Sequence, residues 1–384
     1  TVATEMKRRN MTQPLLIGGA TTSKMHTAVK VAPKYSSMVS PVVHVLDASR
    51  SVTVVSNLLN HNKEEFVESV IEEYDELRED YYASLEDKKF VPFTEAVSKR
   101  LQIDFNDSPP VCKPAMPGTH VVTKDLRDVL PYFDWNPFFQ VFELRGRYPN
   151  RGYPKIFNDE KVGEEAKKLH KDALDMVEFI IENKIFELRG IVGLLPANAV
   201  GTEDVEVYTD DSRTEVATTF RMLRQQAELE GSDDVYRSLA DFIAPKTSGH
   251  ADHLGMFAVA CFGCEEQVAK YELDHDDYSK IMCQALADRF VEAYAEMVHK
   301  EMRTTMWGYA PEESLSEEDL LKVKYQGIRP APGYPSQPDH TEKLSMWDLM
   351  KVKEKTGIGL SDSLSMMPAA AVSALVFSGK TCRC

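Results

Sequence analysis

Long apolar runs and secretory features are missing from this sequence. The longest apolar run, near residues 369–377, is far shorter than the ~20 residues that a transmembrane helix needs. The first ten residues are mostly polar and charged and do not form a secretory signal. Basic charge is also in deficit, because 45 basic residues face 61 acidic ones and the net charge is −16. These absences argue against a membrane protein, a secreted protein and a nucleic-acid-binding protein.

Cysteine is scarce as well, with six residues in a chain of 384, and the cysteines form no disulfide framework. Cys261 and Cys264 have the spacing of a zinc or redox motif, but no second cysteine pair completes a four-ligand site. We interpret them as ordinary thiols, and we expect Cys382 and Cys384 to lie in a disordered chain end. Reduced thiols predict a cytoplasmic protein.

The common catalytic motifs are also missing. The sequence contains no Gly-x-Ser-x-Gly, no His-Glu-x-x-His, no Gly-x-x-x-x-Gly-Lys and no Gly-x-Gly-x-x-Gly. His250, Asp252 and His253 lie close together in the sequence, but on a helix or loop they would not share one face well. We therefore expect a surface cluster there and no metal site.

The first part of the chain alternates short apolar strands with helices. We predict strands at 14–17 and 41–46, a helix at 21–34 with Thr22 or Ser23 as its N-cap, and a second helix that follows a turn and cap at 47–49 and runs through Leu59. This order is typical of a doubly wound α/β sheet, of which only about two units are present. Because the chain begins with Thr1 and not with Met, we expect the start of this domain to be missing.

The regular alternation ends after an acidic helix predicted at 63–88. A proline-rich stretch at 107–118 has no apolar periodicity and is expected to be extended, and an open connection between domains is expected within 65–120. Beyond it we predict helices at 162–181 and 278–302, strands at 190–195 and 204–208, and an apolar segment at 257–261. This irregular order favours an α+β domain.

Two of the stretches that could hold a ligand depend on glycine or on a single acid. Gly18 and Gly19 lie between a strand and a helix N-terminus, where backbone can approach a ligand closely, although a tight turn needs the same residues. Asp134 lies in an aromatic cluster and therefore needs a partner. It either caps the helix that begins near Pro137 or holds a ligand ammonium.

A third stretch, Arg329–Pro335 (RPAPGYP), is the most unusual one in the chain. Its three prolines fix the backbone, so that little ordering is left to do when a ligand binds. Free amides in this loop could face a planar base while the guanidinium of Arg329 holds a carboxylate. The alternative is a rigid turn in which Arg329 satisfies a helix C-terminus.

Taken together, these stretches resemble cobalamin-dependent methionine synthases over nearly the whole chain and in the same order. Two N-terminal segments are similar to cobalamin-contacting segments of the family, 15–26 (LLIGGATTSKMH) and 47–52 (DASRSV). Six others are similar to its activation domain: 132–139 (YFDWNPFF), 223–226 (LRQQ), 241–245 (DFIAP), 307–311 (WGYAP), 329–335 (RPAPGYP) and 339–343 (DHTEK).

The resemblance implies an α+β activation domain preceded by a partial α/β domain, Rossmann-like and doubly wound, that binds cobalamin. Its implied boundaries are 1–69 for the C-terminal part of the cobalamin-binding domain, 70–84 for a linker helix and 85–384 for the activation domain. The sequence departs from the family in lacking the Asp-x-His-x-x-Gly motif of the cobalt-ligating histidine, and again from Gly379 onward, where we expect a truncation.

The resemblance also implies roles for single residues. Gly18, Gly19 and Ala48 would contact cobalamin. S-adenosylmethionine would be bound through its ammonium by Asp134, through its carboxylate by Arg329, and at its adenosine by Ala331, Gly333 and Tyr334. It implies no catalytic residue and no metal ligand in this chain, since the family's zinc site would lie in upstream domains.

The implied function is the reductive methylation of cob(II)alamin to methylcobalamin, which belongs to methyl transfer from methyltetrahydrofolate to homocysteine. The expected partners are the upstream domains of the same methyltransferase and a flavoprotein reductase as electron donor, and the chain alone is not expected to turn over. A neutral thioether leaves and cobalt is the nucleophile, which explains why no acid–base set is needed and why positioning matters. The alternative is a non-catalytic S-adenosylmethionine-binding or partner-docking fragment.

Overall fold

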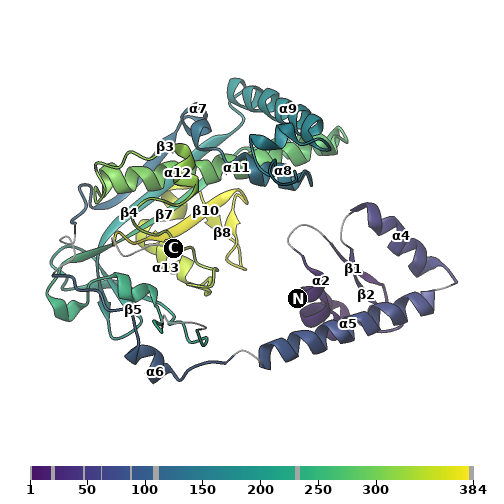
Figure 1. Ribbon diagram of the computed structural model, residues 1–384, viewed down its shortest axis with the longest axis horizontal. Helices are drawn as coiled ribbons and strands as arrows, with labels where there is room; N and C mark the ends of the chain where they lie inside the picture. The colour runs from purple at the N-terminus through teal and green to yellow at the C-terminus, as the bar shows by residue number, and fades with distance from the viewer. Residues whose placement is uncertain are drawn as a thin grey trace. The chain divides into compact units, whose positions relative to one another are not determined.

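The chain divides into two compact units in the computed structural model (Figure 1), which describes residues 2–18, 22–45, 48–61, 63–86, 89–106, 112–229 and 234–379. The first unit comprises residues 1–92 and 226–232, and the second comprises residues 93–225 and 233–384. The domain boundaries that the resemblance implies stay predictions.

The first unit contains a small parallel sheet. Strand β1 (Leu15–Gly18) pairs with β2 (Val42–Val45). A helical run connects them, formed by α2 (Lys24–His26), a π-turn (Thr27–Val31) and α3 (Ala32–Tyr35). It begins at Ser23, whose hydroxyl accepts a hydrogen bond from the His26 amide at 3.1 Å. The predicted strand–helix–strand order is confirmed, and parallel strands require a crossover of this kind.

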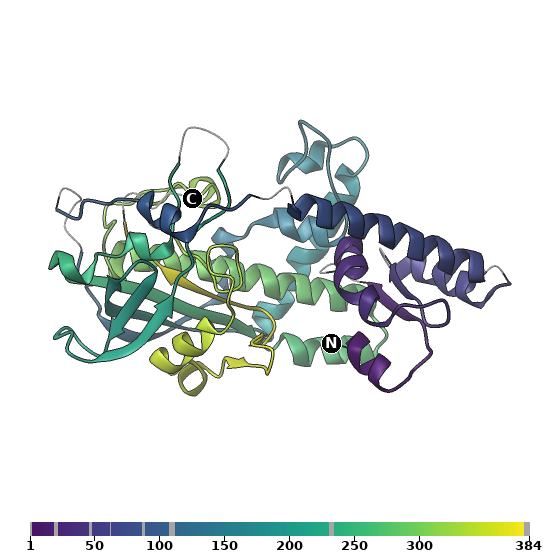
Figure 2. The same ribbon diagram turned by 90° about the horizontal axis from the view of Figure 1, so that it is seen from below.

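Three further helices complete the first unit: α1 (Val2–Arg8), α4 (Ala48–Leu59) and α5 (Lys63–Glu86). Figure 2 shows α5 as one uninterrupted helix, and the predicted linker at 70–84 lies within it. Its apolar side meets the sheet, because Val70 and Tyr74 are buried in the core of the unit with Val42 and Val43. The Tyr74 hydroxyl accepts a hydrogen bond from the His44 amide at 2.7 Å.

The second unit is built on an antiparallel sheet. Its strands are β3 (Gly118–Lys124), β4 (Glu187–Val200), β5 (Asp204–Tyr208), β6 (Val216–Arg221), β7 (Asp252–Phe262) and β10 (Ala371–Val376). They are arranged in the order β10-β7-β4-β5-β6, and β3 pairs with the first half of β4. A separate hairpin contains β8 (Gly359–Leu360) and β9 (Met366–Met367).

Both faces of this sheet are apolar, because its central strands alternate between two cores. In β7, Phe257 and Val259 face one core, whereas Met256 and Ala258 face the other. The first core, which we call the α11 core, contains the long helix α11 (Asp277–Glu301) together with α9 (Gly163–Glu182). The second, the α13 core, contains α13 (Glu342–Met350) and α14 (Val352–Thr356). The sheet is therefore a middle layer.

The other helices of the second unit are short. They are α6 (Phe93–Ser98), α7 (Leu126–Val129), α8 (Trp135–Val141), α10 (Cys264–Leu273) and α12 (Glu317–Leu321). The predicted helices that became α9 and α11 and the predicted strands within β4 and β5 are confirmed, and the fold is a mixture of helix and sheet. In the part of the chain that the structure describes, no helix is long and apolar enough to cross a membrane.

Candidate functional site

Asp134 caps the short helix α8, which confirms the first of the two roles predicted for this residue. Its side chain accepts hydrogen bonds from the Asn136 amide at 2.9 Å and from the Asn136 side-chain amide at 2.8 Å. Both bonds go to Oδ1, so within the described residues Oδ2 has no hydrogen-bond donor from the protein. The acid is half-buried. Neighbouring Phe133 packs edge-on against Phe290 of α11 at 4.7 Å, which fixes the start of α8 on that helix.

Arg329 lies in a segment that extends the sheet beside β10. The amide of Ile328 donates to the Phe377 carbonyl at 3.1 Å, and the Leu375 amide donates to the Pro330 carbonyl at 2.9 Å. The Arg329 side chain then turns toward α11, where Nη2 donates to Glu296 Oε2 at 2.6 Å. The expected alternative, an arginine that satisfies a helix C-terminus, is wrong, because its partner is a carboxylate within the helix.

The guanidinium of Arg329 is only partly satisfied. Its Nη1 is buried without a hydrogen-bond partner among the described residues, and so is Oε1 of Glu296. Burial acts to lower the pKa of Arg329, but the attraction to Glu296 outweighs it and leaves the pKa raised. The side chain therefore stays charged, and its Nη1 group remains available to donate to a ligand.

Three more polar atoms in this part of α11 and its continuation are buried without partners among the described residues: His299 Nδ1, His299 Nε2 and Arg303 Nη1. The Arg303 side chain otherwise forms a fork with Glu313 at 2.8 and 2.7 Å and lies over the Tyr325 ring. Burial, followed by the charges of Arg329 and Arg303, holds the pKa of His299 well below its usual range. The sequence analysis did not identify this group. Polar residues at positions 296, 299 and 303, which share one side of an otherwise apolar helix, could have indicated it.

The loop after Arg329 is closed by its own hydrogen bonds. The Gly333 amide donates to the Gln337 carbonyl at 2.7 Å, the Gln337 amide to the Tyr334 carbonyl at 2.9 Å, and the Tyr334 amide to the Ala331 carbonyl at 3.3 Å. The amides of Gly333 and Tyr334 are therefore occupied, which contradicts the expectation that this loop offers them freely. Tyr334 itself is 66% exposed.

Gly333 is required by two features of this turn. Its φ is +102°, a conformation that residues with a side chain rarely adopt. A Cβ at this position would also lie 2.2 Å from Cε1 of His340, so the imidazole occupies the space where a side chain would be. Sequence reasoning expected the glycine but missed its partner His340.

Helix α11 brings the segments of Asp134 and Arg329 to the same stretch of the fold. Tyr132 accepts a hydrogen bond from Lys300 at 3.2 Å, and Arg329 pairs with Glu296 one helical turn earlier. Residues four apart share one side of a helix, so the two segments lie against neighbouring turns. The structure shows no direct contact between Asp134 and Arg329 among the described residues.

The residues assigned to cobalamin belong to the first unit. Gly18 ends β1, and a Cβ there would lie 3.0 Å from the Val45 carbonyl oxygen, so the neighbouring strand already accounts for glycine. Ala48 begins α4. Gly19 lies outside the described residues, and so do Cys382 and Cys384.

The predicted surface cluster of His250, Asp252 and His253 is wrong for two of its three residues, since only His250 is partly exposed. Asp252 and His253 begin the central strand β7, where they are 4% and 1% exposed. Burial raises the pKa of Asp252 to about 6, although amides of Ala244 and His253 donate to it at 2.8 and 2.7 Å. Burial, with the nearby charge of Arg213, lowers the pKa of His253 to about 4.

Cys261 and Cys264 are buried between β7 and α10, and Cys264 Sγ lies 3.9 Å from the carbonyl oxygen of Cys283. Burial keeps the pKa of Cys261 well above its usual range. In the described ranges, no group of three or more histidine, cysteine or acidic residues is placed to hold a metal ion.

Two of the motifs shared with the family meet in one buried ion pair. Arg224, from the LRQQ segment, forms a fork with Asp241 of the DFIAP segment at 2.8 and 2.7 Å, and it also binds Glu203 at 2.9 Å. Asp241 completes a capping box with Ser238. These motifs are therefore structural, since loss of one partner would leave a buried charge.

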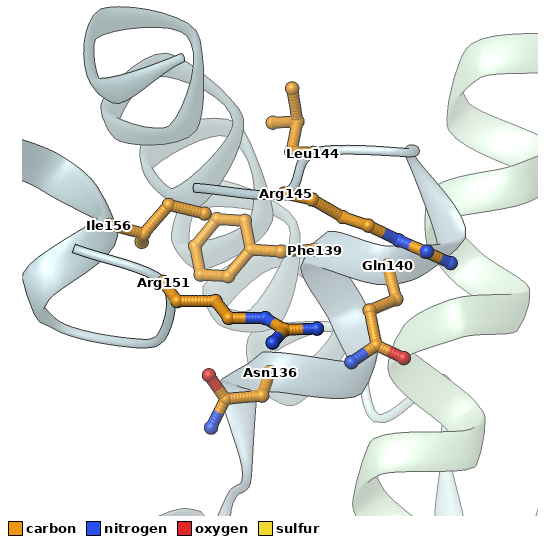
Figure 3. Close-up of a pocket in the computed structure, with 7 residues that line it drawn as sticks. All are labelled: Asn136, Phe139, Gln140, Leu144, Arg145, Arg151 and Ile156. Atoms are coloured by element: carbon orange, nitrogen blue, oxygen red, sulfur yellow. The ribbon is translucent and has the colours of Figure 1, made fainter. Parts of the chain in front are cut away.

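A pocket of about 260 Å³ lies beside α8, a few residues after Asp134 (Figure 3). Its lining residues are Asn136, Phe139, Gln140, Leu144, Arg145, Arg151 and Ile156. None of these was predicted as a site residue. The sequence feature that could have indicated this pocket is the group of basic residues after α8, which matches no known motif.

Comparison with known proteins covers mainly the second unit. The family described as "Vitamin B12 dependent methionine synthase, activation domain" matches residues 125–384. A crystal structure of the MetH reactivation domain bound to AdoHcy is similar to this chain, with 43% sequence identity and a TM-score of 0.72. The similarity covers 77% of this chain and 88% of that chain. The family match includes Asp134 and Arg329 but neither Gly18 nor Ala48.

Proposed function

Because this chain belongs to the family of vitamin B12-dependent methionine synthase activation domains, we propose that it binds S-adenosylmethionine and supports the reductive methylation of cobalamin. The observation that carries this proposal is the unpaired, buried Nη1 of the charged Arg329. The similar solved domain is bound to AdoHcy, the molecule that remains when S-adenosylmethionine loses its methyl group.

The two charged groups of the site match the two charges on the amino-acid end of this ligand. Nη1 of Arg329 would donate to its carboxylate, while Glu296 holds the other side of the guanidinium in place. Oδ2 of Asp134 would accept from its ammonium, while Oδ1 stays bound to Asn136. Because packing on α11 holds both segments before the ligand arrives, little entropy is lost on binding.

The adenosine would lie along the loop of Ala331, Gly333 and Tyr334. The exposed ring of Tyr334 offers an aromatic face, and the hydrogen bonds of the turn hold the backbone that carries it. Bound S-adenosylmethionine supplies a methyl group on a positively charged sulfur. The task of this chain is then to hold that group in a fixed direction, for which positioning is sufficient.

We further propose that residues 1–69 belong to a cobalamin-binding domain. The parallel pair β1 and β2 with its helical crossover supports an α/β origin, and the segment LLIGGATTSKMH supports the cobalamin assignment by resemblance. The surroundings of Gly18 require no ligand, so we derive no contact with cobalamin. Upstream domains of the same enzyme and a flavoprotein reductase, in the cytoplasm, are the proposed partners.

Isothermal titration calorimetry of the full chain with S-adenosylmethionine tests the proposal. Arg329→Ala and Asp134→Asn should each weaken binding by about tenfold or more, since a hydrogen bond to a charged group contributes ~1.5–3 kcal/mol. Arg127→Ala is the matched control, because Arg127 is exposed and its side chain pairs with Glu178 alone among the described residues. If the parent chain and Arg329→Ala bound S-adenosylmethionine with equal affinity, Arg329 could not be the residue that binds the ligand carboxylate.

A second experiment separates methyl transfer from simple binding. The chain is mixed with a cobalamin-loaded upstream domain, a one-electron reductant and S-adenosylmethionine, and methylcobalamin is followed by absorbance. Formation of methylcobalamin that Arg329→Ala abolishes supports reactivation. Binding of S-adenosylmethionine without any methylcobalamin would instead leave a binding fragment.

A further inference from the structure

The pocket beside α8 has a chemical character that the proposed function does not use. Arg145, Arg151 and Gln140 contribute to its polar wall, and Phe139 and Ile156 to its apolar wall. We propose that this pocket binds a small phosphate monoester, with the phosphate between the two arginines and the organic part on the apolar wall. This inference is independent of S-adenosylmethionine binding.

Positive charge gathers here in a protein that is otherwise acidic. Residues 143–155 (ELRGRYPNRGYPK) contain four basic residues and one acidic residue, whereas the whole chain has a net charge of −16. Figure 3 shows the side chains of Arg145 and Arg151 on either side of Phe139, both at the pocket. Neither guanidinium forms an ion pair or a hydrogen bond with any described residue. Two uncompensated guanidinium groups in one pocket favour an anion with several oxygens.

Two carboxylates in this part of the chain, those of Asp159 and Asp134, are held by other groups. Asp159 accepts from the backbone amides of Arg147, Lys161 and Val162 at 2.7, 2.9 and 3.1 Å, and these bonds lower its pKa. Asp134 accepts twice from Asn136. These two acids therefore serve the backbone and the cap of α8, and among the described residues neither forms an ion pair with Arg145 or Arg151.

Neutral donors complete the polar wall. Asn136 is held in one orientation, because its Oδ1 accepts from the Tyr153 amide at 2.8 Å while its Nδ2 donates to Asp134. Gln140 follows one turn later on the same side of α8, and its side chain lines the pocket. The Gln140 amide can donate to a phosphate oxygen that the arginines leave free.

The size and the apolar wall select a monoester over a bare ion. Leu144 contributes a half-buried side chain to the apolar wall, whereas Phe139 and Ile156, at 1% and 2% exposed, form its base and present only the edges of their side chains. A volume of about 260 Å³ exceeds what a bare phosphate ion fills and leaves room for a small ring or chain. Pockets that bind small molecules combine an apolar lining with a few placed polar groups in this way.

The loop that presents the arginines is held in shape before any ligand binds. A Cβ on Gly146 would lie 2.1 Å from the Asn150 carbonyl oxygen, so the two sides of the loop are in contact. Asn150 donates to the Asn158 carbonyl at 3.1 Å, and the Arg147 amide donates to Asp159. A fixed backbone lowers the cost of ordering the site on binding.

Calorimetric titration of the full chain, in phosphate-free buffer of low ionic strength, tests the proposal with inorganic phosphate and phenyl phosphate. We expect saturable binding of both with one site per chain, and phenyl phosphate should bind about threefold tighter or better. Arg145→Gln and Arg151→Gln should each weaken phenyl phosphate by about tenfold. Arg151→Lys keeps the charge without the fork and should give an intermediate loss.

Arg147→Gln is the matched control, since it removes the same charge from the same loop but does not line the pocket. Its affinity should stay within about twofold of the parent. An equal loss in Arg147→Gln, or the absence of saturable binding, would overturn the proposal, and equal affinity for the two probes would overturn the monoester assignment. S-adenosylmethionine titration of Arg151→Gln should match the parent, so failure here is distinct from failure of the proposed function.

Discussion

At the scale of single residues, Gly333 shows how one missing side chain shapes the candidate site. Gly333→Ala should lower both the free energy of unfolding and the affinity for S-adenosylmethionine, because it combines a φ of +102° with a collision against His340. A backbone conformation of this type costs of order 1–3 kcal/mol for other residues. Chemical denaturation and calorimetric titration would measure the two effects.

Gly118→Ala is a matched control for this change. Its φ of +95° is similar, but nothing lies within 4 Å of the Cβ position. It should show the cost of the backbone alone. Combining Gly333→Ala with His340→Ala should recover the part that comes from the collision, and a double variant no better than Gly333→Ala would contradict this explanation.

Asp252 and His253 contribute to stability with opposite dependence on pH. The folded pKa of Asp252, about 6, lies above its unfolded value of ~3.9, so the folded state binds more protons and stability falls as pH rises from about 4 to 6. The folded pKa of His253, about 4, lies below its unfolded value of ~6.5, so stability rises from about 4 to 6.5. Each contribution amounts to about 3 kcal/mol, and they largely cancel.

Substitution of one partner should uncover the other in urea denaturation between pH 4 and 6.5. Relative to the parent chain, Asp252→Asn should make stability rise more steeply with pH across this window, and His253→Gln should make it rise less steeply or fall between about pH 4 and 6. The constant loss of stability that either variant also causes does not affect the difference in slope from the parent. Identical slopes in the two variants would refute the opposed titration.

Sequence reasoning could predict single residues where local chemistry decides, as in the cap formed by Asp134. It could not predict the partner of Arg329, because Glu296 is 33 positions away and meets it only through the packing of α11 on the sheet. The burial of Asp252 and His253 could not be predicted from the sequence either. Two polar residues look like surface in a sequence, although here they begin the central strand of the sheet.

At the scale of elements, α11 is the common support of the candidate site. Its apolar residues fill the α11 core, and the polar residues Glu296, His299 and Lys300 lie near the segments of Arg329 and Tyr132. A long helix anchored in a core is a rigid base for groups that must hold a ligand in one direction. The site therefore depends on a helix that is distant in the sequence from Asp134 and separate from the segment of Arg329.

The long helices and the most apolar strands could be predicted, because periodicity over many residues is a strong indicator. Strands β3, β6 and β10 escaped prediction. β3 (GTHVVTK) is mostly exposed or half-buried, and β6 (VATTFR) buries only Phe220. β10 begins at the last of the three alanines at 369–371, a run that indicates no particular element. Edge strands take their structure from a neighbour, and a neighbour is not visible in local sequence.

At the scale of the whole molecule, the two compact units differ in how much core they possess. Among the described residues, the first unit has one small hydrophobic cluster, whereas the second unit has the α11 core and the α13 core. Small units bury a lower fraction of their surface and are less stable. Differential scanning calorimetry should show two transitions, with the first unit unfolding at the lower temperature.

Conservative variants assign these transitions. Tyr74→Phe leaves the His44 amide without its acceptor and should lower only the first transition, by about 1–3 kcal/mol. Phe257→Leu leaves a cavity in the α11 core and should lower only the second, by about 1–2 kcal/mol. A single transition that both variants lower together would show one cooperative unit instead.

The pairing of β4 with β7 imposes a rule of parity on this chain. The strands stay in register from Glu187 opposite Phe262 to Ala197 opposite Asp252, and both faces of β7 are filled with apolar side chains. Adding or removing one residue inside either strand would exchange its odd and even positions and send each set into the core shaped for the other. Changes of two residues keep odd as odd, so length in these strands can vary only in even steps, while the surface loops accept any number.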